Sequence, residues 1–374
     1  MLLKNARILN ENFKLQNGDL RVEEEQIFEI GESLSPKAGE EISDCGGAYL
    51  LPGFVDLHTH GAMGYDHTDA EPEAEEIISH YLTRQGVTTY LPTLITQSEK
   101  QMKAAAEVIA KAAKTIPQIG GIYSEGPFFS EKYKGAQNPA YLRNPDVREF
   151  ARLQEAADGL IRIISLAPEL SGACEFIRTV TPRVRVSMGH TDADYNQACT
   201  AIQAGASELT HTYNAMRPLH HRTPNTIGAA IDSSCFCECI CDGLHVHPAM
   251  IRLLYHAVGA DRMVLISDSM RACGMPDGKY DLGGQEVFVK EHSARLSDGT
   301  IAGSCVNLAY CVKKAVSFGI PFEDAVKMAS LTPARAAGIE KNIGSIQKGK
   351  YANLILCGSD LDPKQVWMHG KKCI

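Results

Sequence analysis

The chain lacks any run of about 18 consecutive apolar residues, the length that a helix needs to cross a bilayer. Its first residues interrupt their apolar positions with Lys, Arg, Asn and Glu, so they lack the continuous apolar core of a signal peptide. No basic run stands out, and 45 acidic residues against 37 basic ones give a net charge of −8. These absences predict no membrane span, no secretion and no nucleic-acid or anionic-membrane surface. A small anionic substrate stays possible, because one or two Arg residues can hold it.

The C-x2-C spacing of zinc sites is also absent, although the chain has 12 cysteines. Without a secretion signal, these cysteines are typical of reduced thiols, and we expect a cytoplasmic protein. Four of them alternate along one apolar segment, at Cys235, Cys237, Cys239 and Cys241. Alternate positions of a strand share one face, and such neighbours cannot wrap around one ion tetrahedrally. We therefore interpret them as small, buried packing residues.

Short strand-like apolar runs alternate with helix-like segments through the middle of the 374 residues. The clearest helical segments are Glu73–Arg84 and Ser98–Lys114, with later ones at Ser304–Ser317 and Phe322–Ala329. Such alternation predicts an α/β protein, a (β/α)8 TIM-type barrel with a parallel sheet. The eight expected strands are 53–58, 87–94, 119–125, 162–168, 184–190, 207–212, 237–243 and 263–269.

The two ends of the chain do not show this alternation of strands and helices. Residues 1–52 alternate apolar and polar positions between turn signals, and residues 342–374 are strand-like with glycine punctuation. We expect these two ends to pair into one small β-sandwich module. The catalytic barrel then spans residues 53–341.

Histidine and carboxylate side chains fall just after the expected strands. In parallel barrels the carboxyl ends of the strands form the active-site face, so these side chains should converge. His58 and His60 share one strand face about 6–7 Å apart, and Glu125 could bridge two ions. Nitrogen and oxygen ligands favour zinc, iron(II), manganese or cobalt. The expected ligands of this divalent metal site, with one or two ions, are His58, His60, Glu125, His190 and His211.

Asp268 ends the eighth expected strand, after the apolar run MVLIS. Beside a water that a metal makes more acidic, its carboxylate can accept a proton and return it to a leaving amine. The same S-D-S sequence also suits a helix N-cap. We predict Asp268 as the general base and acid, a role that does not exclude the cap.

Several motifs together resemble a known family. LPGFVDLHTHG, with PARAAGI and GSIQKGKYANLIL near the C-terminus, resembles the amidohydrolase superfamily over essentially the whole chain. EGPF, APE, MGHTDAD, HTYNAM, CDGLHVHP and ISDSM resemble the N-acetylglucosamine-6-phosphate deacetylase family within it. The resemblance implies hydrolysis of N-acetyl-D-glucosamine 6-phosphate to glucosamine 6-phosphate and acetate. Many superfamily members carry a carboxylated Lys on the fourth strand, whereas RIISLAPE here has none.

The resemblance also implies substrate-contacting residues. Asn214, Ala215 and Arg222 match the phosphate-binding segment, with Arg222 reaching across the interface of a homodimer. Gln137 stands where many relatives have a His that polarises the substrate carbonyl, and a Gln amide cannot carry positive charge. Polarisation should then depend more on the metal. The remaining implied contacts are Ala136, Asp242, Gly243, Leu244, His245, Ile301, Ala302 and Gly303.

Three alternatives stay open at this point. The galactosamine 6-phosphate epimer differs in one hydroxyl, and the sequence does not resolve that pocket. A cyclic amidase or deaminase on the same scaffold is disfavoured by the N-A-M-x5-R phosphate segment. A catalytically inactive scaffold protein would usually have lost metal ligands, and here every candidate ligand is present.

Overall fold

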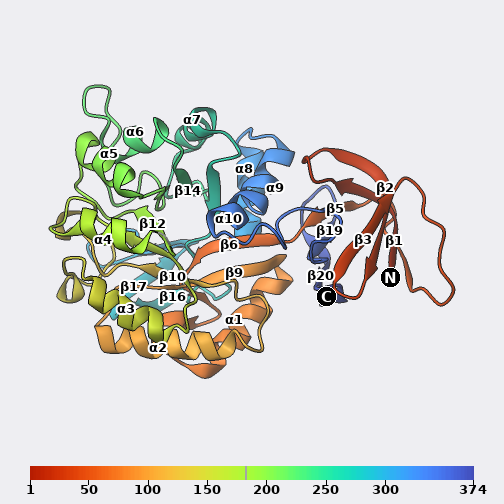
Figure 1. Ribbon diagram of the computed structural model, residues 1–374, viewed down its shortest axis with the longest axis horizontal. Coiled ribbons are helices and arrows are strands. Elements are labelled where there is room, and N and C mark those ends of the chain that lie inside the picture. The colour runs from red at the N-terminus through yellow and green to blue at the C-terminus, as the bar shows by residue number, and fades with distance from the viewer. Residues whose placement is uncertain (182) are drawn as a thin grey trace.

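The computed structural model describes residues 1–181 and 183–374. Figure 1 shows a barrel surrounded by helices and, beside it, a separate sheet in which both chain ends lie. That sheet has the order β21-β20-β19-β5-β1-β2-β3, with β4 pairing β1. Its strands are β1 Leu2–Leu9, β2 Leu15–Glu23, β3 Gln26–Gly31, β4 Ile42–Asp44, β5 Tyr49–Pro52, β19 Leu354–Cys357, β20 Pro363–Met368 and β21 Lys371–Lys372. The expected pairing of the two ends is therefore confirmed, whereas the domain boundaries at 52/53 and 341/342 stay predictions.

Within the described residues, the barrel has eight parallel strands, and each pairs with the barrel strands that come before and after it in the sequence. The ends meet because the backbone N–H of Asp268 donates to the carbonyl of His58 over 2.9 Å, and Thr59 bridges Ser269. The sheet is thus closed, as the alternation of strands and helices predicts. Its strands are β6 Phe54–Thr59, β9 Val87–Leu94, β10 Ile122–Glu125, β11 Ile161–Leu166, β12 Arg185–Met188, β13 Glu208–Leu209, β14 Phe236–Ile240 and β15 Met263–Ile266.

Helices cover the outside of the barrel, and several begin at local signals in the sequence. Ser98 caps α2 by accepting from the N–H of Gln101, and Asp194 forms a capping box at α5 with Gln197. The described helices are α1 Pro72–Arg84, α2 Glu99–Ala112, α3 Val147–Ala156, α4 Ala173–Val180, α5 Tyr195–Ala204, α6 Asn225–Ile231, α7 Pro248–Val258, α8 Leu308–Ser317, α9 Phe322–Met328 and α10 Leu331–Ala336, with short 3-10 turns η1 His67–Asp69, η2 Glu131–Tyr133 and η3 Pro139–Tyr141. Among the described residues, none of the helices has both the length and the apolar character needed to cross a bilayer.

One expected helix begins later than the sequence suggests. Ser304 lies in an extended segment whose backbone N–H donates to the carbonyl of Asp268 over 2.7 Å. The helix α8 starts at Leu308, where the side chain of Asn307 caps it by accepting from the N–H of Tyr310. Pairing with the end of the eighth strand therefore takes precedence over helix propensity.

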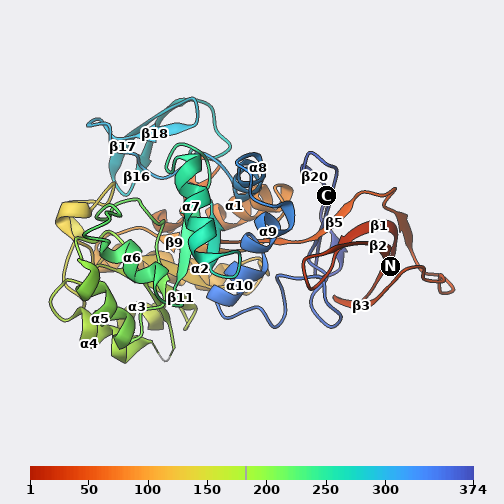
Figure 2. The ribbon, with the colours of Figure 1, turned by 90° about the horizontal axis from the view of Figure 1, so that it is seen from above.

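Two small sheets lie at the rim of the barrel. One is a hairpin of β7 Gly61–Ala62 and β8 Tyr65–Asp66; the other is a three-stranded antiparallel flap of β16 Gly278–Leu282, β17 Gln285–Lys290 and β18 Ser293–Arg295. Figure 2 shows this flap standing above the barrel. The flap follows β15 in the sequence. It lies over the carboxyl edge of the barrel, although most of the barrel strands are distant from it in the sequence.

The alternating cysteines are packing residues, as predicted. Cys235, Cys237, Cys239 and Cys241 are at most 1% exposed and belong to the main hydrophobic core. Burial raises the pKa of Cys237, Cys239 and Cys241, which keeps these thiols neutral. They therefore fill space between β14 and the surrounding helices.

Candidate metal centre

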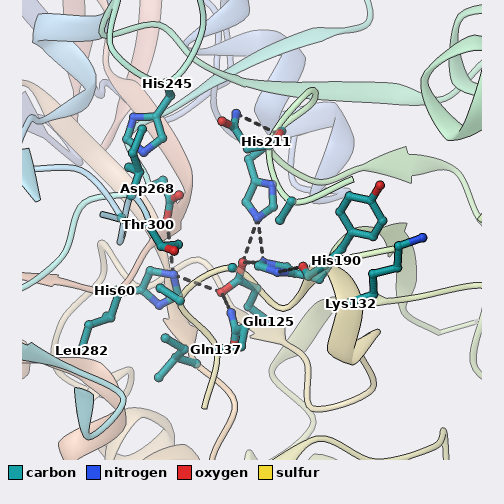
Figure 3. A pocket seen from close by; sticks show the side chains of 18 residues that line it. His60, Glu125, Lys132, Gln137, His190, His211, His245, Asp268, Leu282 and Thr300 are labelled. Carbon is teal, nitrogen blue, oxygen red and sulfur yellow. Dashed lines mark hydrogen bonds and ion pairs between the residues drawn. The ribbon is translucent and has the colours of Figure 1, made fainter. Parts of the chain in front are cut away.

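Three side chains converge at the carboxyl edge of the barrel. Glu125 is the last residue of β10, His190 follows β12 and His211 follows β13. Oε1 of Glu125 lies 3.1 Å from Nε2 of His190 and 3.1 Å from Nε2 of His211, and the two Nε2 atoms are 3.0 Å apart. Figure 3 shows both rings pointing at the carboxylate from one side. All three side chains are buried.

A second group meets the other side of Glu125. Nε2 of His60 lies 3.3 Å from Oε2 of Glu125 and 3.3 Å from Oδ1 of Asp268. Nε2 of His58 lies 3.6 Å from Oε1 of Glu125 and from Oδ1 of Asp268. Glu125 thus belongs to both groups, in the position that a bridging ligand needs.

The chemistry and spacing of these atoms fit divalent metal ions. Ligand atoms about 2.1 Å from one ion lie roughly 3.0–3.5 Å from each other, which is the spacing found here. Within each of the two groups, His58–His60–Glu125 and Glu125–His190–His211, the candidate ligand atoms lie within 4.8 Å of one another. Among the described residues, the buried Nε2 of His58 has no hydrogen-bond partner although it faces two carboxylates. The set of imidazoles and carboxylates therefore favours a metal over a purely hydrogen-bonded core.

Three of these residues have strained backbones. His190, His211 and Asp268 have φ of 45°, 27° and 48°, in the left-handed region that residues with a side chain rarely adopt. Strain of this kind persists where the surrounding structure fixes it, and it concentrates at functional sites. Asp268 is not a helix N-cap, because no helix begins there. Asp268 lies beside His58 and His60, and its role in proton transfer stays a prediction.

Two side chains hold the candidate ligands in place, and neither was predicted from the sequence to do so. Oε2 of Glu238, on β14, accepts from Nδ1 of His58 over 3.1 Å and from the backbone N–H of His211 over 3.0 Å. Gln137 donates from Nε2 to Oε2 of Glu125 over 2.7 Å. Partners of this kind fix the orientation of metal ligands. Glu238 could have been found from its alternation with the cysteines of β14, which directs it to the opposite face of the strand.

The carboxylates of the site are held ionised. Burial raises the pKa of Glu125, but hydrogen bonds from His190, His211 and His60 outweigh it, so the pKa lies well below its ordinary value. Burial likewise raises the pKa of Asp268, and the neighbouring His58 and His60 lower it further than burial raises it. An ionised Asp268 can accept a proton, and an ionised Glu125 can bind a cation.

A pocket of about 360 Å³ opens above these groups. Figure 3 shows its side chains, with Asp268 and His245 on one side and His190 and Lys132 on the other. Sequence reasoning missed Lys132, Tyr133, Ile95, Leu282 and Thr300, which also line it. Leu282 ends β16 of the flap and Thr300 follows its last strand, and neither residue lies in a motif. The predicted residues that line the pocket are His60, Glu125, Ala136, Gln137, His190, His211, Asn214, Ala215, His245, Asp268, Ile301 and Gly303.

The other predicted site residues do not line this pocket. His58 is fully buried beneath it, and Asp242 holds the ring of His245 through an Oδ2–Nδ1 contact of 2.7 Å. Gly243 and Leu244 lie in the same loop as Asp242, and Ala302 is buried behind its pocket-lining neighbours. Arg222 is exposed, and its guanidinium has no hydrogen-bond or ion-pair partner within the described part of the chain.

Comparisons with known proteins place the chain among proteins of one family. Residues 49–373 match the model of the amidohydrolase family. The chain is 37% identical to the N-acetylglucosamine-6-phosphate deacetylase of Vibrio furnissii, over 98% of this chain and 93% of that protein. It is 35% identical to the N-acetylgalactosamine-6-phosphate deacetylase of Escherichia coli O157:H7, over 99% of this chain and 98% of that protein. Among solved structures, it is similar to a mutant N-acetyl-D-glucosamine-6-phosphate deacetylase of Mycobacterium smegmatis in complex with N-acetyl-D-glucosamine 6-phosphate, with a TM-score of 0.94, 32% identity and coverage of 100% of this chain and 99% of that one.

Proposed function

The chain belongs to the amidohydrolase family, and we propose that it hydrolyses N-acetyl-D-glucosamine 6-phosphate to D-glucosamine 6-phosphate and acetate. The observation that carries this proposal is the placement of Asp268 beside a cluster of metal-type ligands at the floor of a pocket. Relatives with the same activity in their names, matched over nearly the whole chain, support the substrate.

We propose that Glu125, His190 and His211 hold one divalent ion, and that His58 and His60 with Glu125 hold a second. When bound, such an ion supplies a more acidic water and a Lewis acid for the acyl carbonyl. Zinc, iron(II), manganese and cobalt all suit this ligand set. Cys273, which is buried, and the β14 thiols lie outside the two groups of candidate ligands, so thiolate coordination is not part of the proposal.

Asp268 moves the proton in this mechanism. Its carboxylate, whose pKa lies below its ordinary value in the structure, accepts a proton from the attacking water. It then gives that proton to the amine nitrogen as the C–N bond breaks, so that glucosamine 6-phosphate leaves as a neutral or protonated amine. Gln137 is held by both ends of its amide, because its Nε2 donates one hydrogen to Glu125 and its Oε1 accepts from the N–H of Thr96 over 3.1 Å, and only the second hydrogen of Nε2 stays available to the carbonyl.

We assign the sugar phosphate to Asn214, Ala215 and His245, which line the pocket. Asp242 fixes the ring of His245 through a 2.7 Å contact between its Oδ2 and Nδ1 of the ring. We propose that the protein is a homodimer in which Arg222 binds the phosphate of the substrate held in the neighbouring subunit's pocket. Arg222 is exposed and does not line the pocket of its own chain. A guanidinium can bind phosphate through two parallel hydrogen bonds. The cytoplasmic location expected from the sequence stays a prediction.

The galactosamine epimer is a second candidate substrate, because the relative from Escherichia coli O157:H7 is matched almost as closely. Turnover of the gluco and galacto 6-phosphates by the same metal-loaded preparation separates the two. We expect acetate from the gluco epimer at the higher kcat/KM. A preference for the galacto epimer would reassign the substrate while leaving the chemistry in place, and no acetate from either would contradict the proposed reaction.

A further inference from the structure

Another cavity, of about 340 Å³, lies at the end of the barrel opposite the metal centre. Arg162 is the second residue of β11 and Arg185 begins β12, so the amino ends of these strands form its wall, whereas the candidate metal ligands lie at the carboxyl ends. Three arginines line the cavity, Arg162, Arg183 and Arg185, together with Ser207 and the end of α10. None of the described residues that line it is acidic.

The guanidinium of Arg185 is held in a fixed position, and its charge is compensated. Its Nε lies 3.5 Å from Oε2 of the buried Glu208 and donates to the carbonyl of Ala336. Its Nη1 donates to Oγ of Ser207 over 2.7 Å, and the group lies 4.8 Å from the centre of the Phe236 ring. Within the described part of the chain, these contacts leave Nη2 of Arg185 without an acceptor.

The charges of Arg162 and Arg183 are not compensated by any described residue. Arg162 donates from Nε to the carbonyl of Gly120, and its two Nη atoms have no acceptor in the part of the chain that the structure describes. Burial alone lowers the pKa of the half-buried Arg162, but a guanidinium stays charged at neutral pH. Arg183 is exposed, and the described residues offer its side chain neither a hydrogen bond nor an ion pair. Two positive charges therefore remain in this cavity, although the chain as a whole has a net charge of −8.

The capping of backbone carbonyls accounts for only part of these arginines. Arg162 and Arg185 each use Nε for such a carbonyl, which leaves their remaining Nη hydrogens and the whole side chain of Arg183 without that role. The hydroxyl of Ser207 accepts from Arg185 and keeps its own hydrogen for another acceptor. A partly buried charge without a counter-charge costs free energy. The donors that remain would be satisfied by an anion with several oxygen atoms.

A phosphate group has the charge and the shape that this cavity needs. A phosphate monoester carries a charge of about −1.5 to −2 at neutral pH, which balances the surplus of Arg162 and Arg183. Its oxygens can accept from several guanidinium groups at once, each through two parallel hydrogen bonds. A carboxylate carries a single charge and two oxygens, so it would leave part of the surplus uncompensated.

We propose that Arg162, Arg183 and Arg185 form a binding site for a small phosphate-bearing ligand at the amino end of the barrel, either inorganic phosphate or the phosphate group of a sugar phosphate. The site lies apart from the proposed metal centre, so the inference does not depend on the proposed function. The chain then binds phosphate groups at two places, this cavity and the substrate pocket.

Calorimetric titration of the metal-loaded protein with inorganic phosphate, at constant ionic strength, tests the site. Arg183→Gln is the first variant, because this side chain makes no contact whose loss would disturb the fold. We expect Kd to rise about 10- to 100-fold, the loss typical of hydrogen bonds between charged groups. Arg162→Gln should act in the same direction, with thermal unfolding as the check that the fold survives the loss of the bond to Gly120. Arg148→Gln, at an exposed arginine on α3 outside the cavity, is the matched control and should bind phosphate like the parent.

Two further ligands and one further variant identify the occupant. Glucosamine 6-phosphate should bind this cavity more tightly than inorganic phosphate if the occupant is a sugar phosphate, and more weakly if it is free phosphate. Acetate should bind more weakly than either. Arg222→Ala, which alters the proposed substrate pocket, should leave the binding of phosphate to this cavity unchanged.

Three results would overturn the inference. The first is phosphate binding that neither Arg183→Gln nor Arg162→Gln weakens, or that Arg148→Gln weakens equally, because the three arginines then form no specific site. The second is the loss of all phosphate binding in Arg222→Ala, which would assign the phosphate to the substrate pocket alone. The third is acetate binding as tight as that of phosphate, which would contradict the class of ligand.

Discussion

The Nε2 atoms of His190 and His211 lie 3.0 Å apart, and each lies 3.1 Å from Oε1 of Glu125. The two histidines come from segments that follow different strands, and both have left-handed backbones. Such a backbone points each ring into the same small volume. A cation at this point would bind both nitrogens and the carboxylate at ordinary ligand distances.

Replacing Asp268 by Asn should remove most turnover while leaving the fold and metal content nearly unchanged. The amide keeps the size of the side chain but cannot take up a proton, and loss of a general acid and base typically costs about 10²–10⁴-fold. Steady-state kcat, with metal content measured on the same sample, checks this. Turnover within a few-fold of the parent would show that another group moves the proton.

Each of the two groups of candidate ligands should hold its own metal ion, so removing one group should remove one ion. We expect one firmly bound ion per chain and a second when metal is in excess. The double substitution His58→Ala and His60→Ala should abolish the second ion and leave the first, because Glu125, His190 and His211 remain. Elemental analysis of proteins dialysed against excess metal measures both. If the parent never exceeds one ion, His58 and His60 do not recruit a second.

Gln137→Ala should weaken metal binding, because Glu125 loses the donor 2.7 Å from its Oε2. Removal of a group that orients a ligand typically costs about 10- to 100-fold in metal affinity or activity. Titration of activity against free metal concentration should therefore shift to higher concentrations. Asn138→Ala is the control, because that side chain accepts from the N–H of Ala140 and does not touch Glu125. If the two variants need the same free metal concentration for activity, Gln137 does not position Glu125.

Arg222→Ala should raise KM for the phosphorylated sugar far more than for N-acetylglucosamine without phosphate. Arg148 is an exposed arginine on α3 outside the pocket, so Arg148→Ala should leave KM for the phosphorylated sugar unchanged. Mixing Arg222→Ala with Asp268→Asn under subunit exchange should restore part of the activity, because one pocket of each hybrid dimer regains both groups. A fully active monomer, or an unchanged KM, would contradict the assignment.

Much of the fold and of the site could be predicted because the relevant signals are local. Apolar runs predicted the eight strands, and the H-x-H pair and isolated residues such as Glu125 predicted most of the candidate ligands at their ends. The start of α8 could not be placed, since Ser304 pairs with the backbone of Asp268, which is distant in sequence. Leu282 was missed for the same reason: nothing near it in the sequence shows that it lines the pocket from the flap.

The most direct test is acetate release from N-acetyl-D-glucosamine 6-phosphate by three preparations: metal-loaded parent, parent stripped with a chelator, and metal-loaded Asp268→Asn. We predict rapid release by the first, loss of release on stripping with recovery when a divalent metal is restored, and at least a 100-fold lower rate, on the order expected for a missing general acid and base, for the third. Acetate release that survives stripping, or that is absent from the metal-loaded parent, would contradict a metal-dependent deacetylase at this site.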